Sequence, residues 1–290
     1  MARLVVRPPG PTSAGGAGDF CQQSTLCSRL SCVSSIRERI EAREELLGAF
    51  LQMGSPVAAD LAGRAGFDWA LIDLEHGAGS ESDLVPQFLG LAASGVAAFV
   101  RVESASRLRI GRALDLGATG IMVPQVNDAD TARQLVAWCQ YPPAGSRGVA
   151  LSARGAGYGR SAHGDVGTLN REIVRIAQIE TRSAVEALDE IAAVDGIDVL
   201  FVGPSDLSHS LGVPGRFDDP SFERALRAIA QASTDHGRAL GVHLPSVAEI
   251  DRYRDLGFTL ISIAADSTGL ASAFRSALNT AAMERAARPG

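Results

Sequence analysis

The segment "LGATGIMVPQVNDADTARQLVAW" (residues 116–138) contains one complete copy of the structural unit on which this chain is built. Gly117 is expected to end a helix, and the apolar run "GIMVP" (120–124) has the composition of a buried parallel strand. "NDAD" (127–130) then supplies an N-cap for an amphipathic helix over 128–139. A helix end, a buried strand and a newly capped helix in this order predict a strand–helix unit of a parallel α/β fold.

The unit recurs from residue 36 onward. Helical stretches such as 104–116, 183–194 and 222–236 separate the strands. About eight units in about 250 residues are typical of a (β/α)8, or TIM, barrel. A doubly wound open sheet is the alternative, and it is disfavoured because no G-x-G-x-x-G follows the first strand. The predicted strands are 46–53, 69–74, 97–102, 120–124, 173–179, 198–203, 239–244 and 260–265.

The composition of the 290 residues excludes several classes of function. No apolar run approaches the roughly 18 residues of a membrane span, and a net charge of −6 argues against nucleic-acid binding. All 27 basic residues are arginine, which excludes a lysine Schiff base. Chemistry on a carbonyl compound would therefore need another electron sink, such as a metal ion.

Residues 1–34 are rich in Gly, Pro, Ser and Thr and lack periodicity, so we expect a flexible tail before a barrel domain at 35–290. The tail lacks the continuous apolar segment of a secretory signal. An extension from an upstream start codon is favoured over a targeting arm.

Three of the four cysteines, Cys21, Cys27 and Cys32, lie in this tail at a spacing that matches no zinc motif. Cys139 falls in a predicted helix and is expected to be a small buried residue. This use of cysteine indicates a reducing compartment, and the cytoplasm is the expected location.

One connection, residues 141–170, is long and rich in Gly, Ser and Arg. Such a loop is typical of a lid or a binding loop. Its residues Arg147 and Arg154 either bind an anionic substrate or are solvated, while His163 in the same loop is a weak candidate.

Active sites of TIM barrels form at the carboxyl ends of the strands, so polar residues that follow the apolar runs are the site candidates. They include several carboxylates, two histidines and an arginine, which is more chemistry than strand ends carry by chance. The candidates are Asp73, Glu75, His76, Arg101, Gln178, Glu180, Ser205, Asp206 and His243.

Glu180 and Asp206 follow adjacent strands. Either carboxylate alone could cap the helix that comes next. As a pair converging on one volume they would repel each other, and a divalent cation removes that repulsion. Two carboxylates with open water positions suit Mg²⁺ or Mn²⁺, and this interpretation is favoured over double capping.

His76, in "DLEHGAGS", is either a buried histidine satisfied by a backbone carbonyl or a general base. Its place at a strand end beside two acids favours the base, with its ring oriented by a carboxylate. Asp73 and Glu75 are near in sequence, and Asp115 is a partner only if the fold brings it close.

Arg101, in "FVRVES", either pairs with Glu103 at the surface or holds an oxyanion at the barrel mouth. The second role is favoured because the strand is otherwise apolar. His243 also ends a strand. Its side chain either contacts the substrate or only packs in the core, and the sequence favours neither role.

Six ordered segments resemble the metal-dependent class II pyruvate aldolases of the HpcH/HpaI type. The resemblance covers about residues 46–281, and it implies a (β/α)8 barrel, a hexamer, and interconversion of 4-hydroxy-2-oxo acids with pyruvate and an aldehyde through a metal-stabilised pyruvate enolate. The segments are "AGFDWALIDLEHG", "FVRVES", "LDLGATGIMVPQV", "YPPAGSRGV", "AQIETRSAVEALDEI" and "VDGIDVLFVGPSDLSHSLG".

The resemblance also implies roles for individual residues. Glu180 and Asp206 match the ligands of a Mg²⁺, Mn²⁺ or Co²⁺ ion. His76 matches the base, and Asp115 matches the aspartate that raises the basicity of that base. In the same comparison Arg101 matches the transition-state arginine. Gln178 and the backbone of 203–205, with Ser205, match the positions that hold pyruvate.

Departures from the family pattern concern the aldehyde side. Leu74 precedes the "EH" pair where many members have glycine, Phe50 stands where tryptophan is common, and His243 replaces an aliphatic residue. The aldehyde partner therefore stays open. Related carbon–carbon lyase chemistry (citrate-forming, decarboxylating or on acyl-CoA esters) and a non-enzymatic binding barrel are the alternatives.

Overall fold

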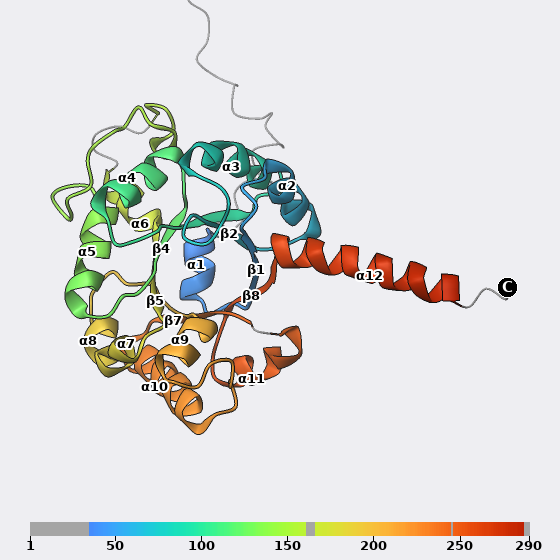
Figure 1. Ribbon diagram of the computed structural model, residues 1–290. Coiled ribbons are helices and arrows are strands. Elements are labelled where there is room, and N and C mark those ends of the chain that lie inside the picture. The colour runs from blue at the N-terminus through green and yellow to red at the C-terminus, as the bar shows by residue number, and fades with distance from the viewer. Residues whose placement is uncertain (1–34, 161–165, 245, 287–290) are drawn as a thin grey trace, which may run out of the picture. The chain divides into compact units, whose positions relative to one another are not determined.

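The computed structural model describes residues 35–160, 166–244 and 246–286. Its eight parallel strands form a closed barrel in chain order, and β8 pairs with β1 (Figure 1). The predicted barrel is confirmed, and the open sheet is excluded. The strands are β1 Leu46–Leu51, β2 Trp69–Asp73, β3 Ala97–Arg101, β4 Gly120–Val123, β5 Val174–Ile179, β6 Val199–Val202, β7 Ala239–His243 and β8 Leu260–Ala265.

Helices alternate with the strands and cover the barrel. They are α1 Ile36–Glu41, α2 Pro56–Ala65, α3 Leu84–Ala92, α4 Arg107–Leu116, α5 Ala129–Cys139, α6 Val166–Glu172, α7 Arg182–Glu186, α8 Leu188–Ala192, α9 Pro204–Ser210, α10 Pro220–His236, α11 Ile250–Asp255 and α12 Asp266–Ala286. Short 3-10 turns occur at Glu81–Asp83, Arg154–Ala156 and Val247–Glu249.

The local signals in 116–138 act as predicted. Gly117 ends α4 with φ of 112°, a left-handed conformation that glycine adopts without strain. Asp128 caps α5 by accepting the backbone N–H of Thr131 at 2.7 Å. The single helix predicted at 183–194 is instead two short helices, α7 and α8, separated at Ala187, whose backbone leaves helical geometry.

Two apolar layers hold the barrel together. The larger lies between the strands and the surrounding helices, and the smaller fills the barrel interior with rings such as Trp69, Phe99 and Phe201. Trp69 contacts both phenylalanines, with ring centroids 5.7 and 6.3 Å apart, and donates its indole N–H to the Leu46 carbonyl at 3.1 Å. The rings close the interior, so polar chemistry is confined to the ends of the strands.

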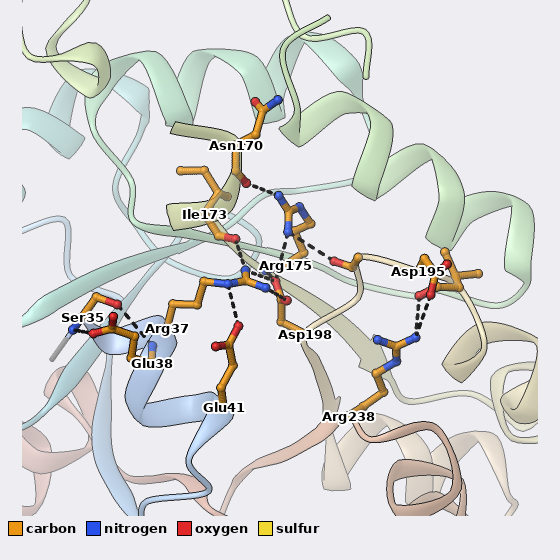
Figure 2. Close-up of polar contacts among 12 residues, drawn as sticks. Ser35, Arg37, Glu38, Glu41, Asn170, Ile173, Arg175, Asp195, Asp198 and Arg238 are labelled. Atoms are coloured by element: carbon orange, nitrogen blue, oxygen red, sulfur yellow. Dashed lines mark hydrogen bonds and ion pairs between the residues drawn. The ribbon is translucent and has the colours of Figure 1, made fainter. Parts of the chain in front are cut away.

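The amino-terminal end of the barrel is closed by α1 and an ion-pair cluster (Figure 2). Arg37 pairs with Asp198 at 2.6 Å and donates to the Ile173 carbonyl at 2.9 Å, while Arg175 reaches the same Asp198 at 3.4 Å. Ile40 of α1 is buried against the barrel interior. Because this cluster lies at the end opposite the carboxyl ends of the strands, we assign it to stability.

The long connection is more ordered than predicted, because its last residues form α6. Arg147 is buried, pairs with Asp115 at 2.8 Å and stacks on Tyr141. Arg154 donates to the Leu116 carbonyl at 3.3 Å. Both arginines thus fasten the loop to the barrel and are not simply solvated.

Several predictions fall on residues outside the described ranges, namely the tail 1–34 with Cys21, Cys27 and Cys32, and His163. Cys139 is a buried free thiol, as expected, and burial raises its pKa to about 12. Among the described residues, the helices are too short or too polar to cross a bilayer.

The last helix departs from the regular barrel pattern. α12 runs away from the strands as a single rod (Figure 1), and all of its residues from 272 to 286 are exposed. In a (β/α)8 barrel the helix after each strand normally packs on the barrel, so α12 leaves its own place uncovered.

Candidate active site

A cavity of about 200 Å³ opens at the carboxyl ends of the strands. Six of the predicted site residues line it together, and Asp73 and Glu180 bond directly to that lining. The lining residues are Phe50, Gln52, His76, Arg101, Gln178, Phe201, Gly203, Pro204, Ser205, Asp206 and His243. The structure therefore gathers strand-end residues from β1, β2, β3, β5, β6 and β7 around one volume.

Arg101 is held in a fixed orientation at the base of this cavity. Its Nε and Nη2 donate to the two oxygens of Asp73 at 2.9 and 2.6 Å, a bidentate pair that is almost completely buried. Burial alone would raise the pKa of Asp73, but Arg101 outweighs it and the pKa lies below its usual value. Glu103 pairs with Arg109 instead, so the predicted surface pair between Arg101 and Glu103 is not formed.

The third nitrogen of the Arg101 guanidinium, Nη1, points to two acceptor oxygens of the cavity. This nitrogen lies 3.2 Å from Glu75 Oε2 and 3.5 Å from Gln178 Oε1, and the guanidinium carbon lies 5.4 Å from the centre of the Phe50 ring. A planar guanidinium aimed in this way can bind a carboxylate or a developing oxyanion.

Glu180 is a buried carboxyl group at the end of β5. Its Oε1 accepts the backbone N–H of Gln125 at 2.8 Å, and its Oε2 accepts the side-chain amide of Gln178. Burial, together with the nearby charges of Asp206 and Glu75, raises the pKa of Glu180 to about 7, although the hydrogen bond from Gln125 and the charge of Arg101 act in the opposite direction.

Neither Glu180 nor Asp206 is the cap of its neighbouring helix. The N-cap of α7 is Thr181, whose hydroxyl accepts the N–H of Ala184, and α9 begins after Gly203 with Asp206 already inside its first turn. Double capping, the alternative to a metal pair, does not occur.

Gly203 allows Glu180 and Gln178 to approach the β6–α9 turn. A β-carbon at this position would lie 2.8 Å from Glu180 Oε2 and 2.9 Å from Gln178 Nε2. Any larger residue would therefore displace the Glu180 carboxylate or the amide that holds it.

The donor set fits a hard divalent cation. Glu180, Asp206 and Glu75 are oxygen donors, and the charges of Asp206 and Glu75 raise the pKa of Glu180. Among the described residues Glu75 Oε2 is buried without a hydrogen bond, although Arg101 Nη1 lies 3.2 Å from it. These residues form no ready-made cluster of three or more His, Cys, Asp or Glu ligands in the described ranges. Glu180 and Asp206 could thus supply two ligands, with the remaining positions open to water and substrate.

His76 extends into the cavity mouth and its side chain is 58% exposed. Its ring lies beside Glu75, at 3.7 Å from Nε2 to Oε1, whereas Asp73 accepts only its backbone N–H, at 3.2 Å. Asp115 lies on α4 and pairs with Arg147, so within the described chain Glu75 is the carboxylate beside the imidazole.

His243 both packs and lines the cavity. Its ring lies 4.7 Å from that of Phe50, and its Nδ1 shares a hydrogen bond of 2.8 Å with the Ser262 hydroxyl. Burial and the charge of Arg101 lower the pKa of His243, so the imidazole is neutral at pH 7.

A second cavity of about 440 Å³ adjoins the first and shares Pro204, Ser205 and His243 with it. Its other walls combine the hydroxyl side chains of Ser246 and Thr268 with apolar ones such as Leu244 and Ile263. The two cavities together form an elongated site with His243 at their junction.

Two site residues, Gln52 and Gln125, were not among the predicted candidates. Gln52 lines the cavity after β1, and Gln125 follows β4 with φ of 52°, an uncommon conformation for a residue other than glycine. Gln125 directly follows the predicted strand 120–124, so the strand-end rule applied to every polar residue would have selected it, whereas Gln52 lay inside the predicted strand 46–53 and was hidden because β1 ends at Leu51.

Closed (β/α)8 architecture, with carboxylates, an arginine and imidazoles around one cavity at the strand ends, defines an enzyme of the TIM-barrel class. The profile of the "HpcH/HpaI aldolase/citrate lyase" family matches residues 46–273. The chain is 38% identical to a hydroxypyruvate/pyruvate aldolase of Paraburkholderia phytofirmans, over 84% of this chain and 95% of that protein.

Two further comparisons agree. A 5-keto-4-deoxy-D-glucarate aldolase of Klebsiella pneumoniae is 34% identical, over 80% of this chain and 91% of that protein. The crystal structure of an HpcH/HpaI aldolase/citrate lyase family protein from Burkholderia cenocepacia superposes with a TM-score of 0.80 at 34% identity, covering 85% of this chain and 98% of that one.

The chain therefore belongs to the HpcH/HpaI aldolase/citrate lyase family. The resemblance predicted from the sequence is confirmed, as are the assignments to the carbon–carbon lyases and to class II aldolase chemistry. A non-enzymatic binding barrel is thereby excluded.

Proposed function

We propose that this enzyme interconverts a 4-hydroxy-2-oxo acid with pyruvate and an aldehyde, using a divalent metal ion at Glu180 and Asp206. The observation that carries the proposal is the buried Glu180 carboxyl, whose pKa is raised to about 7 while two further carboxylates face it. Such an arrangement is unfavourable unless a proton or a cation neutralises it.

The metal ion, Mg²⁺, Mn²⁺ or Co²⁺, would supply a Lewis acid beside the 2-oxo group, where negative charge develops. The chain's own groups orient the substrate. Gln178, fixed against Glu180, and the start of α9 around Ser205 line the side of the cavity where the oxo-acid end would lie. The Arg101 guanidinium, pre-oriented by Asp73, binds the oxygen that becomes negative.

In this proposal His76, which lines the cavity mouth, takes the proton of the 4-hydroxyl group. As that proton leaves, the C4 oxygen forms the aldehyde carbonyl, the C3–C4 bond breaks, and its electron pair passes into the pyruvate unit. Protonation at C3 then completes pyruvate, and the reverse sequence forms the bond. Glu75 lies 3.7 Å from His76 and stabilises the imidazolium that forms. Asp115 has the corresponding role only if its carboxylate is brought to His76, for example across a subunit contact.

The aldehyde portion would occupy the second cavity. His243 stands at its entrance, and Ser246 and Thr268 supply hydroxyl groups within it. A neutral imidazole and two hydroxyls suit a short aldehyde that carries hydroxyl groups. The names of the two relatives, which refer to hydroxypyruvate and 5-keto-4-deoxy-D-glucarate, agree with small oxygenated substrates.

We also propose that the chain forms a homo-oligomer, with hexamers as the expected state, and acts in the cytoplasm. An apolar groove of about 500 Å³ runs over β1, β8 and α2, where the helix after β8 would normally pack, and the first two turns of α12 (Asp266, Gly269, Leu270 and Ala273) form one of its edges. α12 carries a row of exposed apolar residues, and from 267 to 283 its only charged residue is Arg275. The row consists of Leu270, Phe274 and Leu278, which follow one another at four-residue spacing on one face of the helix.

The occupant that fits this groove is α12 of a second copy. Asp266 accepts the backbone N–H groups of Gln52 and Met53 at 2.8 and 3.2 Å, which directs α12 away from its own groove. A continuous helix cannot turn back from there without breaking these bonds. Reciprocal exchange covers both grooves and both helices, as a two-fold interface requires.

The test of the function is an assay of pyruvate release over a panel of 4-hydroxy-2-oxo acids and CoA thioesters. Metal-dependent release from the oxo acids alone is expected. Turnover of the thioesters, with none of the hydroxy-oxo acids, would favour the related lyase chemistry and contradict the proposal.

A further inference from the structure

Gln52 connects the first turn of α12 to the site. It follows β1 directly, lines the catalytic cavity, and places its side chain between Ser267 and Asp73. Its Nε2 donates to Asp73 Oδ2 at 3.2 Å, and its Oε1 accepts the Ser267 hydroxyl at 2.8 Å. The amide therefore uses its donor end toward the active site and its acceptor end toward α12.

The orientation of this amide is set by its two partners. Asp73 is an ionised carboxylate and accepts hydrogen bonds only, so the NH₂ end must face it. The oxygen end then faces Ser267, whose hydroxyl can donate. The backbone N–H of Gln52 donates to Asp266 Oδ1 at 2.8 Å, which gives α12 a second hold on the same residue.

Asp73 lies between Gln52 and Arg101 and is hydrogen-bonded to both. The oxygen that accepts the Gln52 amide, Oδ2, also accepts Nη2 of Arg101 at 2.6 Å. The other oxygen, Oδ1, is occupied by Arg101 Nε and by the backbone N–H groups of Glu75 and His76 at 3.1 and 3.2 Å. Gln52 is thus the one side chain besides Arg101 that hydrogen-bonds the Asp73 carboxylate among the described residues.

We propose that Gln52 is a positioning residue for Arg101. Because Gln52 is bonded to Ser267 and Asp266, the position of the Arg101 guanidinium then depends on how the first turn of α12 packs against β1. The inference rests on the proposed function, because it takes Arg101 to act on the substrate. It extends that function because it connects α12, the helix proposed to pack on a second copy of the chain, with Arg101 in the catalytic cavity.

The coupling has a physical reason. Asp73 is buried, so a change in its hydrogen bonds is not compensated by water, and its carboxylate must rotate or shift to recover them. Because the pair with Arg101 is bidentate, a rotation of the carboxylate moves the guanidinium with it. Small errors in the position of such a group lower the catalytic rate more than they weaken substrate binding.

A double-mutant cycle tests the connection. The four proteins are wild type, Gln52→Ala, Ser267→Ala and the double variant, with Ser272→Ala as the matched control on an exposed position of α12. We expect kcat for pyruvate release to fall by about tenfold in Gln52→Ala and by about threefold in Ser267→Ala, with KM changed less. The double variant should equal Gln52→Ala, and Ser272→Ala should match wild type.

Two results would overturn the inference: full kcat in Gln52→Ala, or losses that simply multiply in the double variant. The free energy of unfolding is measured for the same four proteins. The losses of stability in Gln52→Ala and Ser267→Ala should again be non-additive in the double variant. This second readout separates the two claims. A wild type that releases no pyruvate contradicts the proposed function, whereas additive effects on unfolding contradict the connection through Gln52.

Discussion

Glu180 Oε1 accepts the backbone N–H of Gln125 at 2.8 Å, and Gln125 holds the left-handed conformation that aims this N–H at the carboxylate. A backbone donor favours the ionised form of Glu180, yet burial and two neighbouring carboxylates raise its pKa to about 7. The site therefore holds the Glu180 carboxylate in place but supplies too little positive charge to balance it. A bound cation would supply that charge.

The stability of the metal-free protein should depend on pH through Glu180. Its pKa is raised from 4.5 to about 7 in the folded state, so the folded protein binds this proton more tightly than the unfolded chain. The stabilisation is complete below pH 4.5 and is lost as pH rises toward 7, a loss of roughly 3 kcal/mol at most. Urea unfolding in EDTA at several pH values measures it.

The control for this dependence is Glu180→Gln. The variant should lack the decline between about pH 4.5 and 7 and should be more stable than wild type at pH 8 without metal. Adding Mg²⁺ or Mn²⁺ at pH 8 should then stabilise wild type and leave the variant unchanged. Parallel pH curves for the two proteins would show that Glu180 does not carry the effect.

Gly203→Ala should weaken metal binding. The new methyl group would lie under 3.0 Å from Glu180 Oε2 and Gln178 Nε2, so the carboxylate must move out of place. We expect the metal concentration for half-maximal activity to rise at least about tenfold, by analogy with the loss of a group that orients a ligand. Gly148→Ala is the matched control, because a β-carbon there meets no atom within 4 Å. Equal effects of the two changes would argue against a special role for Gly203.

Arg101→Lys should lower kcat by roughly 10²- to 10³-fold, the loss typical when an oxyanion donor is removed. Lysine keeps the charge but cannot make the bidentate pair with Asp73, so the position of the charge is lost. Steady-state kinetics with wild type and Arg109→Lys, which alters an exposed pair with Glu103, provide the comparison. A kcat for Arg101→Lys within threefold of wild type is incompatible with the assigned role.

His243→Leu should change the choice of aldehyde more than the binding of pyruvate. The substitution removes the polar group at the junction of the two cavities and the hydrogen bond to Ser262. In the synthetic direction, kcat/KM for hydroxylated aldehydes should fall by about tenfold or more relative to apolar ones. An unchanged ratio between hydroxylated and apolar aldehydes would place the aldehyde elsewhere.

Phe274→Glu should dissociate the oligomer. Phe274 is 63% exposed on the apolar row of α12, and a charge there cannot enter the groove over β1, β8 and α2. Light scattering should give a mass above 30.2 kDa for wild type and a smaller assembly for the variant. Asn279→Glu adds the same charge at an exposed polar position and should behave as wild type. A monomeric wild type at micromolar concentration would contradict the proposed packing of α12 in the groove of a second copy.

Much of the fold was predictable because its signals are local and repeated. Buried runs such as 120–124, glycines such as Gly117 and caps such as Asp128 each determine a strand, a helix end or a helix start on their own. The destination of α12 was not predictable, because its apolar residues indicate a buried helix without identifying the surface that buries it.

The site was predictable where charge accompanies a strand end, as at Arg101 and Glu180. Partners were harder to predict, because they depend on which side chains the closed barrel brings together. Asp73 and Glu75 were both candidates for the carboxylate beside the His76 ring, and Glu75 lies there while Asp73 holds Arg101. Arg147 was expected to meet substrate or solvent, and it pairs with Asp115. Gln52 and Gln125 act through an amide and a backbone N–H, which neither charge nor periodicity reveals.

The most direct test of the central claim is pyruvate release measured after removal and return of metal. We expect that EDTA abolishes release by wild type, that Mg²⁺, Mn²⁺ or Co²⁺ restores it, and that Glu180→Gln combined with Asp206→Asn stays inactive at every metal concentration. Full activity of the wild type in EDTA, or restoration of the double variant by metal, would contradict it.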